Sequence, residues 1–510
     1  MKQQQNTKAS LSSLIKSSRD IMRKDAGLNG DLDRLPQLSW ILFLKCYDDL
    51  EIRREEDAKA TRQKYKPIIP PPYRWRDWAS NENEGATGED LIKFVNDGLL
   101  PALRGLSGSD ERLKVAEVFK ETYSRMLSGY LLRDVVNLVD GIHFQSKDEI
   151  FTLAHLYESM LKEMRDAAGD SGEFYTPRPV VKLIVGRTKP RLGETVLDPA
   201  CGTGGFLVEA YEYLKPLAKN SKDQIKLQSE TLYGVEKKPL PYLLGTMNLL
   251  LHGIENPNIR RDNALKNPLN EIGEKDRFDV IVTNPPFGGE EEEAGIQLNF
   301  PESLRASETA LLFMQFVMRS LKHGGRCGVV VPNGFLFGDG VSARIKEQLL
   351  RNFDLHTIIR LPNGVFAPYT GIQTNLLFFA RPGLDTPLAK SAQGYSTTAT
   401  TDIWFYEHSL PEGQKTYSKT RPMQFEEFAP LVEWWDAREE NEHAWKVCAD
   451  DVLKYDENKN LLSVNLDVKN PSLKDDLIHL PPHELAESIL DKEKQITLIM
   501  EEIKQFLAEK

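Results

Sequence analysis

Residues 196–206 read Val-Leu-Asp-Pro-Ala-Cys-Gly-Thr-Gly-Gly-Phe, and this stretch decides the fold class. It predicts a short apolar strand that ends in Asp198, then a glycine-rich turn, then a helix. Glycine suits such a turn because it tolerates sharp backbone angles and the close approach of a ligand. No Gly-Lys-Ser/Thr follows and the spacing is not GxGxxG, so neither a phosphate loop nor a dinucleotide site is indicated. A cationic, zwitterionic ligand fits better, with Asp198 holding an ammonium group and backbone N–H groups holding a carboxylate.

Short apolar segments alternate with helical stretches around this turn. The expected strands are 195–197, 231–235, 278–282, 327–331, 357–360 and 374–380, and the expected helices are 205–214, 241–252, 309–321 and 342–353. This alternation predicts an α/β domain over residues 149–425. We expect a Rossmann-like, largely parallel sheet with helices on both faces. Ligands of such sheets bind beyond the carboxyl ends of the strands.

The flanking regions are predicted to be helical. Residues 1–148 form an expected all-α domain, interrupted by a proline-rich segment at 67–78 that we expect to pack Trp75 and Trp78 onto that domain rather than touch DNA. Residues 426–510 form an expected helical tail for subunit assembly. Its last part, from His483 on, is amphipathic over a length that requires a partner helix.

Composition narrows the class of protein. The 510 residues are 40% hydrophobic and 28% charged, which is typical of a globular protein with two or three domains. No run reaches the roughly 20 apolar residues of a membrane span. The four cysteines form no CxxC pair, so we expect no metal site and a cytoplasmic location. The net charge of −11 is acidic for a chain that binds nucleic acid alone, so any such binding favours a partner that supplies most of the contacts.

S-adenosylmethionine carries both groups that the turn at 196–206 suits, and it is the expected cofactor. Glu236 ends the second expected strand, where an acid accepts the hydroxyls of a ribose. Asp262 is expected to accept from the adenine amino group, and the segment at 172–179 to close over the methionine end. The predicted cofactor-binding residues are Glu173, Phe174, Tyr175, Thr176, Asp198, Ala200, Gly202, Thr203, Gly204, Gly205, Phe206, Glu236, Asp262, Asn263 and Ala264.

The most specific signal is an apolar strand that runs directly into Asn284-Pro285-Pro286-Phe287. Two adjacent prolines cannot continue a sheet, so the backbone leaves it rigidly. The amide oxygen of Asn284 and the carbonyl of Pro285 are then suited to accept both hydrogens of an exocyclic amine, whose conjugated lone pair makes it a poor nucleophile. Such a site orients the amine and stabilises its charge. Phe287 is expected to stack on a base flipped out of the duplex.

These motifs resemble the amino-methyltransferases of DNA, and their order looks like the gamma class of N6-adenine methyltransferases. Over nearly the whole chain the sequence is similar to the modification subunits of type I restriction-modification systems, including the segments 361–370, 403–406 and 465–471. The resemblance implies two modification subunits on one specificity subunit that reads a bipartite sequence in double-stranded DNA, and it admits a restriction subunit. It also implies that Phe366 or Tyr369 stacks on the flipped adenine opposite Phe287.

Three other functions stay open from the sequence. An Asn-Pro-Pro-aromatic tetrapeptide also serves enzymes that methylate RNA amines or glutamine amides in protein. A non-catalytic, cofactor-binding assembly subunit is a second alternative, although it would have little use for Asp198, Glu236 and Asn284 together. A fused nuclease is a third, but no nuclease or helicase motif is evident. The acidic run Glu290–Glu293 beside the tetrapeptide is expected to become ordered only in an assembly.

Overall fold

The computed structural model describes most of the chain. The described residues are 8–80, 85–142, 175–287, 295–367, 370–384, 398–418 and 420–472, together with Ala154, Tyr157, Glu158, Leu161, Gly289, Leu490, Glu493, Lys494, Thr497 and Met500. The acidic run Glu290–Glu293 lies outside the described residues. So does the expected amphipathic helix after His483, apart from Leu490, Glu493, Lys494, Thr497 and Met500.

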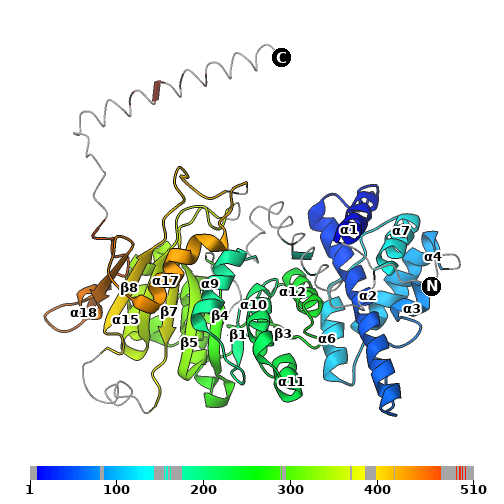
Figure 1. The fold of residues 1–510 in the computed structure, drawn as a ribbon, viewed down its shortest axis with the longest axis horizontal. Helices are drawn as coiled ribbons and strands as arrows, with labels where there is room; N and C mark the ends of the chain where they lie inside the picture. The colour runs from blue at the N-terminus through cyan, green and yellow to red at the C-terminus, as the bar shows by residue number, and fades with distance from the viewer. Residues whose placement is uncertain are drawn as a thin grey trace.

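Helices alone make up the N-terminal part that is described. They are α1 (Lys8–Met22), α2 (Asp31–Ala60), α3 (Trp75–Trp78), α4 (Gly88–Lys93), α5 (Leu100–Arg104), α6 (Asp110–Phe119) and α7 (Gly129–Asp140), with a π-helical turn at Phe94–Leu99. Figure 1 shows them grouped at one side of the sheet. Trp75 and Trp78 are buried, and the Trp75 indole donates to Asp140 over 2.6 Å. The predicted packing of the proline-rich segment is confirmed.

A mixed sheet forms the centre of the molecule. In the described part of the chain its nine strands lie in the order β3-β2-β1-β4-β5-β7-β6-β8-β9. The strands are β1 (Val196–Asp198), β2 (Leu232–Glu236), β3 (Asn258–Arg261), β4 (Phe278–Thr283), β5 (Leu321–Pro332), β6 (Asp354–Arg360), β7 (Thr374–Ala380), β8 (Asp402–Glu407) and β9 (Ala444–Cys448). The half from β3 to β5 is parallel, whereas β7 runs antiparallel to both of its neighbours.

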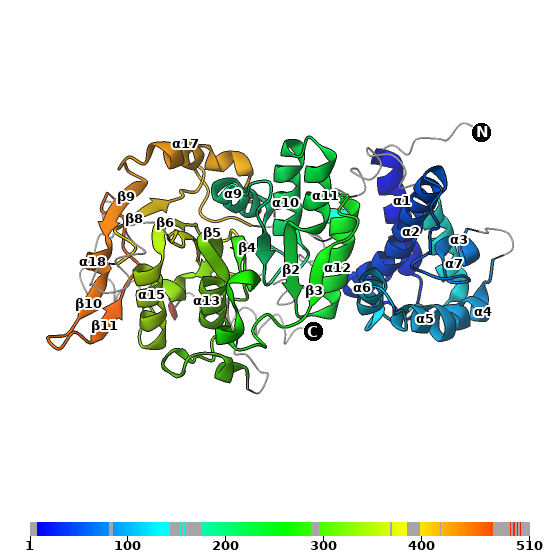
Figure 2. The same ribbon diagram turned by 90° about the horizontal axis from the view of Figure 1, so that it is seen from below.

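Helices cover both faces of this sheet, as Figure 2 shows. One face carries α9 (Arg178–Thr188), α10 (Gly205–Leu214), α11 (Ser221–Ser229), α12 (Pro239–Leu251) and α17 (Ala429–Ala437), and the other carries α13 (Thr309–Ser320) and α15 (Val341–Asn352). Phe335 and Leu336 of α14 (Asn333–Phe337) pack into the same core as α13 and α15. The side chains of a strand alternate between the faces. Accordingly, Val330 joins the core under α9 and α10, while Val329 and Val331 join the core under α13 and α15. The Rossmann-like α/β prediction is confirmed.

The region after residue 425 differs from the helical tail that we expected. Residues 444–448 form β9, which pairs antiparallel with β8 at the edge of the main sheet. A further short helix, α18 (Ala449–Val452), leads into a hairpin of β10 (Leu453–Tyr455) and β11 (Leu461–Val464). The reason is the packing of Trp445, whose ring stacks on Phe405 of β8 at 5.3 Å. Such cross-strand aromatic pairs stabilise a sheet and cannot be read from local helical spacing.

Two helical glycines give a matched test of how closely α12 packs against the glycine-rich turn that follows β1. A Cβ at Gly245 of α12 would lie 2.7 Å from the carbonyl oxygen of Gly202, whereas a Cβ at Gly186 of α9 would meet nothing within 4 Å. We expect Gly186→Ala to raise the free energy of unfolding by about 0.5–1 kcal/mol through helix propensity. Gly245→Ala should lower it by about 1–3 kcal/mol because the turn must shift. Thermal unfolding that finds Gly245→Ala as stable as Gly186→Ala would contradict this packing.

Candidate functional site

The order of the central strands brings three polar side chains to one edge of the sheet. β1 lies between β2 and β4, and all three run parallel. Their carboxyl ends therefore meet, and these ends carry Asp198, Glu236 and, directly after β4, Asn284. Crevices at such an edge are where open α/β sheets bind their ligands.

The glycine-rich turn is held in place by its own hydrogen bonds. Gly202 and Gly204 have φ angles of 51° and 76°, which other residues rarely adopt. The N–H of Gly202 donates to the Glu236 carboxylate over 2.9 Å, and the second carboxylate oxygen accepts from the N–H of Lys238 over 2.7 Å. A Cβ at Gly204 would lie 2.4 Å from Leu249, so α12 fixes the turn from behind. Glu236 is thus an anchor of the turn in this structure.

Asp198 is almost completely buried. Its Oδ1 accepts hydrogen bonds from the Thr283 hydroxyl at 2.7 Å and from the N–H of Ala200 at 3.2 Å. Burial raises the pKa of this carboxyl from its ordinary value of 3.8 to about 7, more than those two hydrogen bonds lower it. Glu236 adds a smaller upward contribution. A cationic ligand would favour the charged form of Asp198, so the site is suited to a ligand of that sign.

Asn284 presents an unpaired acceptor. Its Nδ2 donates to the Thr176 hydroxyl over 3.0 Å, which turns the amide so that Oδ1 faces away from Thr176. That Oδ1 is buried and accepts no hydrogen bond within the described part of the chain. A buried acceptor without a donor is unfavourable by about 1–3 kcal/mol, so such atoms occur where a ligand supplies the donor.

Two of the predicted stacking residues contact each other. The rings of Phe287 and Phe366 lie edge to face with centroids 5.5 Å apart, and both are buried. A base stacked between them would require these rings to separate. Tyr369 lies outside the described residues, as do Glu173 and Phe174.

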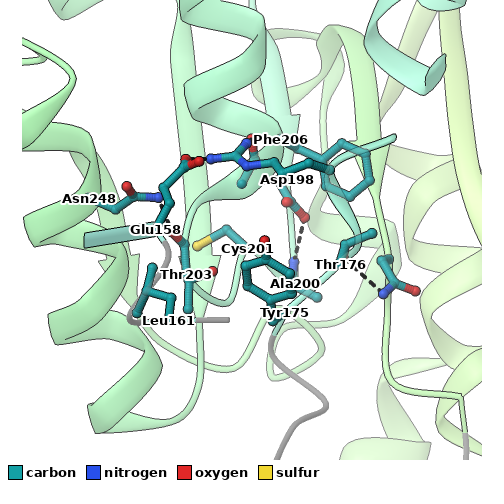
Figure 3. Close-up of a pocket in the computed structure, with 13 residues that line it drawn as sticks. Glu158, Leu161, Tyr175, Thr176, Asp198, Ala200, Cys201, Thr203, Phe206 and Asn248 are labelled. Atoms are coloured by element: carbon teal, nitrogen blue, oxygen red, sulfur yellow. Dashed lines mark hydrogen bonds and ion pairs between the residues drawn. The ribbon is translucent and has the colours of Figure 1, made fainter. Parts of the chain in front are cut away.

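One pocket is lined by both Asp198 and Asn284, and Figure 3 shows its lining. Eight residues predicted for the site line it, namely Tyr175, Thr176, Asp198, Ala200, Thr203, Gly205, Phe206 and Asn284. Five further residues complete the lining, namely Glu158, Leu161, Arg178, Cys201 and Asn248. The mixture of apolar and polar walls is typical of a small-molecule site.

Asp262, Asn263 and Ala264 do not line this cavity, and Ala264 lines a different pocket together with Tyr233 and Gly234. The N–H of Asp262 donates to the carbonyl of Glu236 over 3.0 Å. Its carboxylate pairs with Lys266 at 2.6 Å and with Arg260 at 3.4 Å. The Asn263 amide accepts from the N–H of Leu265 over 3.0 Å. The predicted contact of Asp262 with an adenine therefore competes with two cations.

Thr283 and the five further lining residues were not predicted for the site, and three of these six form hydrogen bonds that hold it together. Thr283 binds Asp198, Arg178 donates to the carbonyl of Gly205 over 2.9 Å, and Asn248 donates to the carbonyl of Thr203 over 2.9 Å. A signal existed for Asn248, because it is a polar residue in the otherwise apolar run at 247–251. Arg178 stood within the quoted segment at 172–179 but received no role.

Membrane insertion and metal binding find no support in the described residues. None of their helices has the length and apolar character needed to cross a membrane. They also contain no group of three or more His, Cys, Asp or Glu side chains placed to hold a metal ion.

Comparison with known proteins gives matches along the chain. The family model of N-6 DNA methylases matches residues 148–474, and that of the HsdM N-terminal domain matches residues 11–139. The methylase subunit of the type I restriction enzyme EcoEI from Escherichia coli is 46% identical, with 94% of each chain covered. A structure of a type I modification subunit from Vibrio vulnificus YJ016 is 54% identical over 93% of this chain and 99% of that one, with a TM-score of 0.81. A chain in a structure that concerns complex assembly of a type I restriction-modification system is 39% identical over 99% of each chain, with a TM-score of 0.79.

The buried carboxylate of Asp198 leads to a prediction about stability. The pKa of the Asp198 carboxyl is higher in the folded protein than in the unfolded chain. Its contribution to the free energy of unfolding is therefore present at low pH and is lost as the pH rises through about 7. Asparagine keeps the Oδ1 acceptor without the charge. We expect Asp198→Asn to stabilise the ligand-free protein at pH 8 by up to about 4 kcal/mol, with little effect near pH 4.

Asp279 is the matched control on β4. Burial alone would raise its pKa, but hydrogen bonds from Lys322 and Thr195 outweigh that effect and leave the pKa below its ordinary value. Asp279→Asn should therefore destabilise the protein at pH 8. Thermal unfolding across this pH range that finds the same sign for both substitutions would contradict the account of Asp198.

Proposed function

The chain belongs to the family of type I restriction enzyme methylase subunits and is an N-6 DNA methyltransferase, and from this premise we propose how its site works. It transfers a methyl group from S-adenosylmethionine to the N6 atom of an adenine flipped out of DNA. The observation that carries the proposal is the unpaired, buried Oδ1 of Asn284 in one cavity with Asp198.

The cofactor's chemistry fits the donors and acceptors of the cavity. S-adenosylmethionine supplies an electrophilic methyl group on a sulfonium and therefore brings positive charge. Asp198 offers a carboxylate whose ionised form such a charge favours, and Tyr175 and Thr176 line the same cavity. We assign Glu236, at the end of β2, to the ribose, where it would accept hydrogen bonds in addition to the one from Gly202.

Asn284 acts on the target base. Its Oδ1 accepts a hydrogen bond from one N6–H group, and we assign the carbonyl of Pro285 as the acceptor for the other. These two hydrogen bonds increase the electron density at N6 and turn its lone pair toward the methyl group. Orientation and preorganised dipoles provide the rate enhancement. Phe287 and Phe366 would move apart to stack on the adenine, with Tyr369 as a further candidate. Unstacking of the base from the duplex costs a few kcal/mol.

The net charge of the chain and its family support a proposal about the assembly in which it works. A chain with a net charge of −11 is poorly suited to hold DNA alone. We assign sequence recognition to a specificity subunit that binds two copies of this chain, with the segment after His483 as the candidate contact, and we place the complex in the cytoplasm on DNA. A restriction subunit would join it to cleave unmodified DNA.

The division of labour along the chain is part of the same proposal. We assign residues 1–148 to a helical domain and residues from 149 to a catalytic domain that includes β9, so that only the chain beyond the β10–β11 hairpin is left for assembly. The family models support this division, because they match residues 11–139 and 148–474 separately.

The direct test is methyl transfer by the purified complex to DNA, RNA and protein acceptors. We expect Asn284→Ala to lower transfer to DNA by about a hundredfold or more, because an acceptor at the reacting amine is lost, while cofactor affinity stays within about twofold. Radiolabelled methyl transfer and calorimetry measure the two effects. Transfer to DNA at the wild-type rate by Asn284→Ala would remove the assigned role, and transfer only to RNA or protein would overturn the substrate.

Thr176 is expected to position Asn284 through its hydroxyl. Without that acceptor the amide is free to rotate and to offer its NH2 group to the base. We expect Thr176→Val to lower kcat about tenfold, in line with the loss of one hydrogen bond, and Thr176→Ser to restore most of it. Single-turnover kinetics with saturating cofactor measure kcat. Equal losses in both variants would show that the methyl group, not the hydroxyl, matters.

A further inference from the structure

We propose that Asn248 binds the amino-acid end of S-adenosylmethionine, and that the Oδ1 of Asn248 accepts a hydrogen bond from the cofactor's ammonium group. This assignment rests on the proposed function, since it requires that this cofactor occupies the cavity. It adds a residue of α12 to the predicted site, and it gives the ammonium group a second acceptor beside Asp198, to which the sequence assigned that group.

Asn248 carries a second buried amide oxygen without a partner. The residue is 1% exposed, lines the cavity, and donates from Nδ2 to the carbonyl of Thr203 over 2.9 Å. That hydrogen bond fixes the amide plane, because the reverse orientation would place two oxygens together. Oδ1 then has no donor among the described residues. A structural tie to the turn explains Nδ2 but leaves Oδ1 unexplained.

The position of Asn248 suits the end of the ligand opposite to the target base. In Figure 3, Asn248 and Thr176 lie at opposite sides of the cavity, and Thr176 is hydrogen-bonded to Asn284. The methyl group must face Asn284. The amino-acid end therefore extends away from it, along the turn toward Thr203 and Asn248.

The charged side chains that line the cavity are suited to bind the ammonium and carboxylate groups of an α-amino acid. Arg178 forms an ion pair with Glu158 and donates to the carbonyl of Gly205 over 2.9 Å, and both charged residues line the cavity. Burial lowers the pKa of Arg178 to about 10, so it stays cationic at neutral pH. A guanidinium has five N–H donors, which suits it to bind a carboxylate as well as its present partners. Arg178 is thus the matching group for the ligand's carboxylate.

A chemical double-mutant cycle tests the contact with Asn248. The probes are S-adenosylhomocysteine and its analogue in which hydrogen replaces the ammonium group, and the proteins are wild type and Asn248→Ala. We expect the wild type to bind the analogue about tenfold or more weakly, as for a hydrogen bond to a charged group. In Asn248→Ala this difference should shrink to a few-fold, because the ammonium group has lost one of its acceptors. Calorimetry measures all four affinities.

Thr246→Val is the control on the same helix, since its hydroxyl donates to the carbonyl of Tyr242 over 2.8 Å and does not line the cavity. It should leave the tenfold difference intact. An undiminished difference in Asn248→Ala, or a wild type that binds both probes equally, would overturn the assignment. The comparison of the two probes on the wild type requires no variant, so the proposal is testable even if Asn248→Ala fails to fold. Failure of the wild type to bind S-adenosylhomocysteine at all would instead contradict the proposed function.

Discussion

The hydrogen bond from Thr283 to Asp198 joins the ends of β4 and β1, and the rest of the site is arranged around it. It fixes the buried carboxylate next to the point where Asn284 leaves the sheet. Because β2 lies on the other side of β1, the same arrangement brings Glu236 to the glycine-rich turn. The cofactor site and the base site that we propose therefore share one edge of the sheet, where Thr283 ends β4 and Asn284 follows it.

This edge departs from the rule that buried polar groups are paired. The fold buries a carboxylate whose pKa rises to about 7, and it leaves the amide oxygens of Asn284 and Asn248 without donors among the described residues. Each of these features destabilises the ligand-free protein. The two large hydrophobic cores on either face of the sheet offset that loss. Departures of this kind are expected where a ligand completes the structure.

The sequence predicted the parts of the fold that depend on local patterns. The strands at β1, β2, β4, β5, β6 and β7 were expected from short apolar runs, and the turn from its glycines. β9 was missed because its stability comes from Trp445 on Phe405, a contact between segments about 40 residues apart. The orientation of the Asn284 amide and the unpaired Oδ1 of Asn248 depend on Thr176 and Thr203, which only the folded chain brings near. No local pattern contains that information.

We propose that this edge of the sheet methylates adenine at N6, with Asn284 as the group that acts on the base. The most direct measurement is the position of N6-methyladenine in the DNA of a methylation-free host that expresses this chain with its specificity partner. The account predicts N6-methyladenine at one bipartite sequence, and none when the same assembled complex carries Asn284→Ala. Unmethylated adenine in a host where the wild-type complex assembles and binds cofactor would contradict it.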